Sequence, residues 1–181
     1  MQQLLEWTLE AIRKEGSDFS WMEEFRFDWV PLIGNALRKV VAGQTVLILN
    51  DTRRNWFGRY IVSHINRPEL NRPFVPFYPL QGNFPNLAEI ETTQQMRSLE
   101  DVLDISYPGG WFLWYIGEGG DRYAKLAYRN DENLLWLFDG QVPNSFNLRK
   151  HDPLLDIKLL QLYRLFDRTL EAALFNEVEL D

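Results

Sequence analysis

The chain of 181 residues contains no cysteine. Disulfides, thiolate metal sites and thiol catalysis are therefore excluded, and the composition is compatible with a reducing compartment. The sequence also lacks an uncharged apolar run near the ~20 residues that a bilayer-spanning helix requires. Its start, MQQLLEWTLEAIRKEG, has an amphipathic pattern rather than a basic stretch followed by an apolar run, which argues against a secretory signal. We expect a cytoplasmic protein without a membrane partner.

Positive charge is scarce. The chain has 19 basic and 26 acidic residues, a net charge of −7, and no block of five Lys or Arg. Phosphate backbone repels an acidic protein unless its basic residues gather on one face. Direct binding of nucleic acid is therefore disfavoured.

The residue patterns that carry catalysis are also missing. The two histidines, His64 and His151, are far apart and show no metal-binding spacing. Carboxylates are numerous, but nothing in the sequence pairs two of them across a cleft, and no nucleophile lies beside a histidine. The turn 117–120 is glycine-rich but lacks the lysine of a phosphate loop. We predict no catalytic site, metal or cofactor.

Apolar residues make up 45% of the chain and aromatic residues 14%, enough for one globular domain. Short apolar runs, typical of buried strands, alternate with helical patterns. We expect strands at 45–49, 74–78, 111–116 and 134–138, the second demoted to an edge by Pro76. Helical patterns lie at 5–15, 30–41, 56–65 and 123–128, with looser apolar spacing over 87–103 and an irregular aromatic stretch over 17–28.

This alternation predicts an α/β fold with a doubly wound, mostly parallel sheet flanked by helices. We divide the single domain 1–181 into N-terminal helices (1–43), a sheet core (44–150) and a C-terminal helix (151–181).

The last segment predicts a long helix from Pro153 to about Val178, with Asp152 as its N-cap. One face carries an apolar stripe from Leu155 to Ala173, whereas Ile157 and Phe175 fall roughly opposite. A helix that is apolar on more than one side needs more than one apolar neighbour. The second neighbour is another helix, a second subunit or a partner protein.

The loop Asn50-Asp-Thr-Arg-Arg-Asn55 follows the first predicted strand, where doubly wound sheets present ligands. Thr52, Arg53 and Arg54 could hold phosphate or contact a partner. Alternatively, Asp51 or Thr52 caps the next helix and both arginines lie in solvent. The loop has no glycine that would let backbone amides wrap a phosphate.

Several segments resemble the HobA family. They are His151-Asp-Pro-Leu-Leu-Asp-Ile-Lys-Leu-Leu-Gln-Leu-Tyr-Arg-Leu-Phe166 with the 174–178 ending, Leu47-Ile-Leu-Asn-Asp-Thr-Arg-Arg-Asn-Trp-Phe57 through Arg67, and Leu135-Trp-Leu-Phe138. The match covers most of the chain and is patchy over about 80–110. The same segments are more distantly similar to DiaA and, through it, to sugar isomerase (SIS) domains.

The resemblance implies a non-enzymatic, homotetrameric regulator of replication initiation. Such a protein binds the N-terminal domain of DnaA and promotes DnaA assembly at the origin. A phosphosugar-binding SIS protein or isomerase is the alternative. Only Thr52 retains a hydroxyl in the SIS phosphate loop, however, and Ile157 stands at the position of the SIS catalytic glutamate, preceded by Asp156.

The resemblance also suggests partner-binding residues. The Leu-Phe pair that contributes to DnaA contact in DiaA-like proteins falls on Leu174 and Phe175. Arg53 and Arg54 are candidate charges at the rim of the same interaction. For Leu174 and Phe175, a place in the core or in a subunit interface remains the alternative.

Overall fold

A parallel five-stranded sheet forms the centre of the computed structural model, which describes residues 1–140 and 142–180. Every neighbouring pair of strands is parallel, in the order β2-β1-β3-β4-β5. The strands are β1 (Thr45–Asn50), β2 (Phe77–Pro79), β3 (Trp111–Glu118), β4 (Leu134–Phe138) and β5 (Ser145–Leu148). The predicted doubly wound α/β fold is confirmed.

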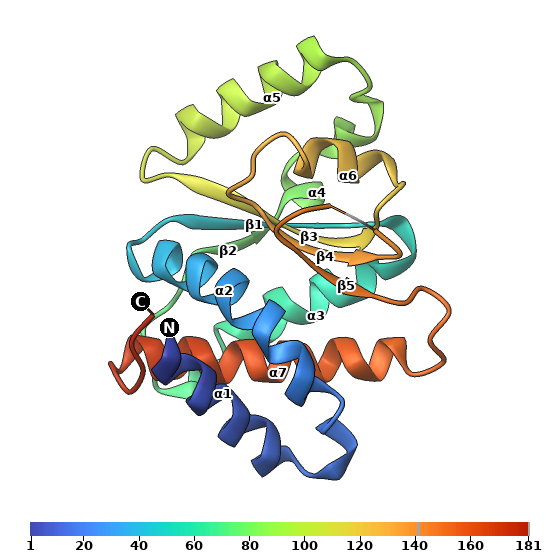
Figure 1. Cartoon of the computed structure of the whole chain (residues 1–181). Coiled ribbons are helices and arrows are strands. Elements are labelled where there is room, and N and C mark those ends of the chain that lie inside the picture. Colours follow the sequence, from blue (N-terminus) through green and yellow to red (C-terminus); the bar gives the residue numbers. More distant parts are fainter. Residues whose placement is uncertain (141, 181) are drawn as a thin grey trace.

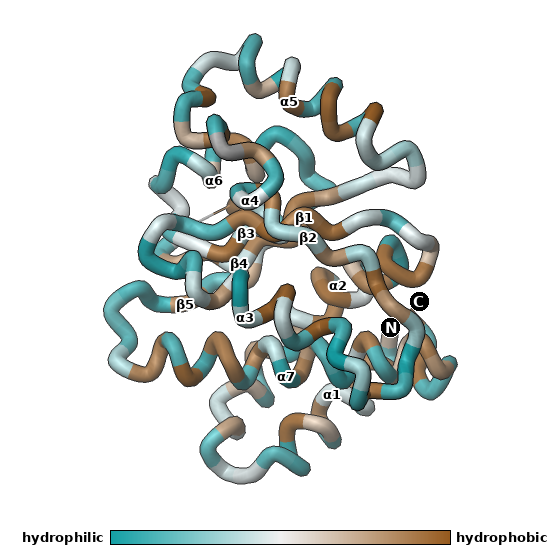
Figure 2. Tube along the Cα trace, turned by 180° about the vertical axis from the view of Figure 1, so that it is seen from behind, coloured by the Kyte–Doolittle hydropathy of each residue, from teal (hydrophilic) through white to brown (hydrophobic). Residues whose placement is uncertain are grey.

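Helices cover both faces of this sheet. They are α1 (Gln2–Glu15), α2 (Met22–Val41), α3 (Asn55–Ile65), α4 (Leu80–Asn83), α5 (Thr93–Ser106), α6 (Arg122–Ala127) and α7 (Leu155–Leu174). One face carries α1, α2, α3 and α7, and the other carries α4, α5 and α6 (Figure 1). In the hydropathy view, the central strands form a hydrophobic middle layer between these two helical layers (Figure 2). Among the described residues, none of the helices is long and apolar enough to cross a membrane.

Two of the sheet predictions need correction. The strand expected at 74–78 forms only at Phe77–Pro79, although its place at an edge of the sheet is confirmed. The opposite edge strand, β5, was not predicted, because its four residues alternate polar and apolar and include Ser145 and Asn147. Pairing with β4 defines this strand, rather than its own propensity.

The aromatic stretch over 17–28 is more regular than expected. A 3₁₀ turn covers Ser17–Phe19, and α2 begins at Met22 with Glu23 and Glu24 in its first turn. Acidic residues are favourable there because they face the positive end of the helix dipole. The loosely patterned region after residue 87 also contains a well-defined helix, α5, which starts from a capping box formed by Thr92 and Gln95.

The C-terminal helix is shorter than predicted at both ends. Asp152 accepts a hydrogen bond from the Leu154 amide at 2.8 Å, and the helix proper starts at Leu155. It ends at Leu174, after which Asn176 adopts a left-handed conformation with φ 56°. Val178 is buried after this turn and is not part of the helix. Helical periodicity fits Val178 only by coincidence of spacing.

Only the side of α7 next to its main apolar stripe is covered by other helices of the described chain. Both α1 and α2 pack against α7, and the partly buried Leu160 and Leu174 lie against the same core. For the side with Leu160 and Leu174, the neighbour is another helix, as one of the alternatives had it. The large apolar side chains at its ends, including Ile157 and Phe175, remain exposed. The amphipathic pattern of α7 alone therefore does not require a second subunit.

Candidate functional site

The loop after β1 is organised by one buried carboxylate. Asp51 caps the 3₁₀ turn Thr52–Arg54 by accepting the Arg54 amide at 2.9 Å on Oδ1. Its Oδ2 accepts the backbone amide of Glu118, at the end of β3, at 3.0 Å. We expected Asp51 or Thr52 to cap the next helix; Asp51 does act as a cap, but of the 3₁₀ turn, whereas α3 begins after Arg54 without a side-chain cap. Asp51 also ties together the carboxyl ends of β1 and β3.

The two arginines of this loop have different surroundings. Arg53 is 77% exposed at its side chain, and its Nη1 lies 3.8 Å from Oε1 of Glu118. The side chain of Arg54 is only 11% exposed and reaches Oδ2 of Asp51 at 3.2 Å. The Arg54 guanidinium also lies over the ring of Phe138, 4.3 Å from its centroid. The prediction that both arginines lie in solvent is therefore wrong for Arg54, which holds the loop against the sheet.

Glu118 joins this cluster to the loop before α7. Its Oε2 accepts a hydrogen bond from Nζ of Lys150 at 2.7 Å. That hydrogen bond, together with the nearby positive charges, holds the pKa of Glu118 below its ordinary value. Nothing in the sequence pairs Glu118 with Lys150, because their juxtaposition depends on the pairing of β3, β4 and β5.

This arrangement leaves little for a phosphate to bind. The Asp51 carboxylate already occupies the amides of Arg54 and Glu118, which is the kind of donor that a phosphate loop offers to its ligand. Thr52 is exposed and Gly117 is closely packed, since a Cβ added there would lie 2.6 Å from Oη of Tyr115. A nearby hollow of ≈ 190 Å³, lined by Asn50, Arg59 and others, is small. The described residues include no group of three or more potential metal ligands of the His, Cys, Asp and Glu types.

Leu174 and Phe175 are adjacent in sequence but differ in exposure. Leu174 ends α7 and packs partly buried against the main core, whereas Phe175 is 48% exposed just beyond the helix. Of the two, Phe175 is the more exposed.

The structure does not bring the four predicted residues into one surface. The loop carrying Arg53 and Arg54 lies at the carboxyl ends of the strands, near the start of α7. Residues 174–175 lie at the other end of α7, close to the N-terminus (Figure 1). On one monomer, Arg53 and Phe175 therefore belong to two separate surfaces.

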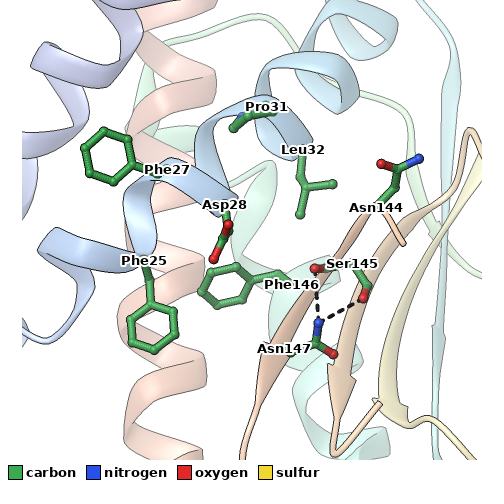
Figure 3. A pocket seen from close by; sticks show the side chains of 9 residues that line it. All are labelled: Phe25, Phe27, Asp28, Pro31, Leu32, Asn144, Ser145, Phe146 and Asn147. Carbon is green, nitrogen blue, oxygen red and sulfur yellow. Dashed lines mark hydrogen bonds between the residues drawn. The ribbon is translucent and has the colours of Figure 1, made fainter. Parts of the chain in front are cut away.

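Sequence reasoning missed an exposed group of aromatic residues on α2. Phe25 and Phe27 lie within the stretch 17–28 that we expected to be irregular, and both are exposed. They border a hollow of ≈ 390 Å³ next to β5 (Figure 3). The aromatic composition of the stretch was a signal, but only its helical conformation shows which rings face outward.

The comparisons with known proteins agree over the whole chain. The family model described as "HobA: DNA replication regulator" matches residues 1–180. The DNA replication regulator protein HobA of Helicobacter pylori is 30% identical over 194 residues, covering 99% of this chain and 100% of the relative.

Two solved structures from the same organism are also similar. A HobA–DnaA (domain I–II) complex matches with a TM-score of 0.73 and 27% identity, over 98% of this chain and 99% of that chain. HobA itself matches with a TM-score of 0.71 and 26% identity, over 98% of each chain. The resemblance seen in the sequence is confirmed, and the chain belongs to the HobA family of DNA replication regulators.

Proposed function

We propose that this protein binds the N-terminal domain of the replication initiator DnaA and, as a cytoplasmic homotetramer, promotes DnaA assembly at the origin. The observation that carries the proposal is the full-length similarity to a HobA chain solved in complex with DnaA (domain I–II). The protein acts through contacts rather than catalysis. No second function is proposed, because Asp51 occupies the amides that a phosphosugar would need.

The four candidate contact residues differ in how far they are exposed. Phe175 and Arg53 are exposed and offer an apolar anchor and a charge, respectively. Leu174 and Arg54 support them from the core and the loop. Because Phe175 and Arg53 lie at opposite ends of α7, we assign them to two separate DnaA-contacting surfaces, and we assign positioning to Leu174 and Arg54.

We base the proposed self-association on exposed apolar side chains elsewhere on the surface, rather than on the apolar pattern of α7. Large apolar side chains remain exposed at several places, among them Phe74 beside β2 and Ile105 on α5. We assign these exposed side chains to contacts between subunits, because apolar and aromatic side chains supply much of the energy of protein interfaces. The net charge of −7 supports recruitment of DnaA without direct DNA contact.

Isothermal titration calorimetry with the isolated N-terminal domain of DnaA tests the binding. Wild-type protein is expected to bind, and Phe175→Ala or Arg53→Ala to weaken binding without changing the melting temperature. Leu174→Ala is the comparison, since it removes a partly buried side chain and is expected to lower stability as well. No binding of the wild-type protein at tens of micromolar would reject the proposed function.

Light scattering measures the mass of the protein alone and with the DnaA domain. A monomeric mass would reject the homotetramer but not the DnaA contact.

A further inference from the structure

A trough runs along the outer side of α2. Its first part is the hollow of ≈ 390 Å³ between the start of α2 and β5, and its second is a hollow of ≈ 210 Å³ that reaches Asn35 and Ala36. Both parts are lined by Pro31, Leu32 and Asn144, so they adjoin each other along α2. The close-up shows α2 and β5 as the two walls of the first part (Figure 3).

The floor and one rim of the trough are apolar. Phe146 is buried at its base and meets Phe25 edge to face at 6.2 Å. Phe27, 57% exposed, and Phe25 stand at the outer end, with Leu32 further along. Exposed aromatic rings of this kind are typical anchors of protein interfaces.

The charge of the trough has one sign. Asp28, Asp131 and Glu132 line it, and no Lys, Arg or His does so among the residues that the structure describes. Lys39 pairs with Glu132 at 2.6 Å, whereas Asp28 and Asp131 have no ion pair with any described residue. Arg26 lies over the outer ring of Phe27 at 4.1 Å. Arg149 and Lys158 line a separate hollow beyond Phe25 and Asn147, where Lys158 already pairs with Asp152 at 2.6 Å. A partner that desolvates this trough must therefore bring positive charge to Asp28 and Asp131.

An extended strand does not suit the trough. Asn147 Nδ2 donates to the backbone carbonyl of Ser145 at 3.3 Å and to its hydroxyl at 3.1 Å. These contacts, drawn in Figure 3, occupy a backbone acceptor of the edge strand β5 that an added strand would use. A helix, whose backbone bonds are internal, has no such need.

The length of the trough also fits a helix. The α2 residues that line it span Phe25 to Ala36, eleven steps along the helix. At ~1.5 Å per residue this is ~17 Å, or about three turns of a second helix lying alongside. We propose that this trough is a docking site for a cationic amphipathic helix of about three turns, on a partner protein.

The proposed site is separate from the end of α7 that carries Phe175. The trough begins near the start of α2 and beside β5, whereas Phe175 lies by the N-terminus, at the far end of α7 (Figure 1). The site therefore goes beyond the proposed DnaA contact, and a partner there would leave Phe175 accessible.

The probe is a synthetic helical peptide of about three turns (~11 residues). It has leucines at positions one, four, five and eight, and lysines on both flanks. Two control peptides have the same composition in scrambled order, or glutamate in place of lysine. Each is titrated into the isotope-labelled full-length protein and followed by amide chemical shifts.

The expected result is saturable binding of the cationic helix alone, with shifts confined to α2, β5 and the 131–134 turn. The variants Phe27→Ala and Asp28→Lys, both on the surface, are each expected to weaken binding severalfold and together about tenfold or more. Trp56→Ala and Asp101→Lys are the matched controls for an exposed ring and an exposed carboxylate elsewhere, and should bind the peptide as the wild type does. Unchanged melting temperatures show that the variants fold.

Several outcomes would overturn the proposal. Equal binding of the scrambled peptide, shifts outside the trough, or wild-type affinity of the double variant would each show that the trough is not the site. If Phe27→Ala has a lower mass than the wild type by light scattering, the trough mediates contacts between copies of this chain instead. Loss of DnaA-domain binding in the trough variants, with no peptide binding to the wild type, would assign it to DnaA. Failure of the wild-type protein to bind DnaA, with peptide binding intact, would reject only the proposed function.

Discussion

The two faces of the sheet are built from the same strands but carry different cores. The face under α1, α2, α3 and α7 contains three fully buried tryptophans, Trp29, Trp114 and Trp136. Their rings lie 4.8 Å apart between Trp114 and Trp136, and 5.2 Å apart between Trp29 and Trp136. The opposite face is leucine-rich, with Leu113 and Leu137 next to those tryptophans in sequence.

Successive side chains of a strand point to opposite faces, so one apolar run serves both cores. The bulky aromatic residues fall on the face with four helices, α7 and α2 of 20 residues each. The leucines fall on the face with the short α4 and α6 and with α5. We infer that the aromatic face contributes most of the fold's stability and that the leucine face is the more easily opened.

The largest effect is expected from Trp114→Ala. This change empties the centre of the aromatic face, where Trp114 also lies 4.5 Å from the Phe166 ring of α7. Removal of a buried tryptophan costs about 3–5 kcal/mol in unfolding free energy, because the lost contacts leave a cavity. Urea denaturation followed by fluorescence measures this loss of unfolding free energy. Trp56→Ala, at an exposed ring, is the control, and an equal loss there would contradict a central role for Trp114.

Leu103→Ala tests the leucine face and should have a smaller effect. Leu103 is fully buried between α5 and the sheet. We expect a loss of about 2–3 kcal/mol, toward the low end for a buried leucine, because α5 can move to fill the space. The same denaturation assay applies. A loss greater than that of Trp114→Ala would reverse the assignment of the stronger face.

Much of this architecture was predictable from the sequence. The run Thr45–Leu49 is apolar on both faces, and such a run is typical of a central parallel strand. β5 was not predictable, since its four residues include the polar Ser145 and Asn147 and its place at the edge depends on the order of the whole sheet. The end of α7 was misplaced because Val178 repeats the helical spacing after the chain has already turned at Asn176.

The candidate site was predictable in its location but not in its detail. A loop after β1 is where such sheets present ligands, and the structure places Asp51, Arg53 and Arg54 there. Which arginine is buried depends on the Phe138 ring and on Glu118, both distant in sequence. The sequence did not reveal the role of Phe25 and Phe27 for the same reason, because they lie beside β5 only in the folded chain.

A further test of the leucine face concerns the start of α5. Thr92 Oγ1 accepts the Gln95 amide at 3.2 Å, and Gln95 Oε1 accepts the Thr92 amide at 3.0 Å. Thr92→Ala removes half of this capping box and should cost about 1 kcal/mol. Hydrogen exchange is the measurement, and α5 amides should exchange about fivefold faster while those of α7 do not change. Equal acceleration in both helices would show that α5 does not open on its own.

The smallest effect is expected from Glu118→Gln, at the carboxyl end of the central strand β3. Contact with Lys150 lowers the pKa of Glu118 in the folded protein, so the ion pair stabilises the fold above the ordinary carboxyl pKa of 4.5 and this contribution is lost as pH falls below it. The substitution should cost less than about 1 kcal/mol near neutral pH, as for other partly exposed pairs. The difference from wild type should shrink in acid, which denaturation at neutral pH and below pH 4 measures. A difference in unfolding free energy that stays constant with pH would mean that Glu118 contributes through packing rather than charge.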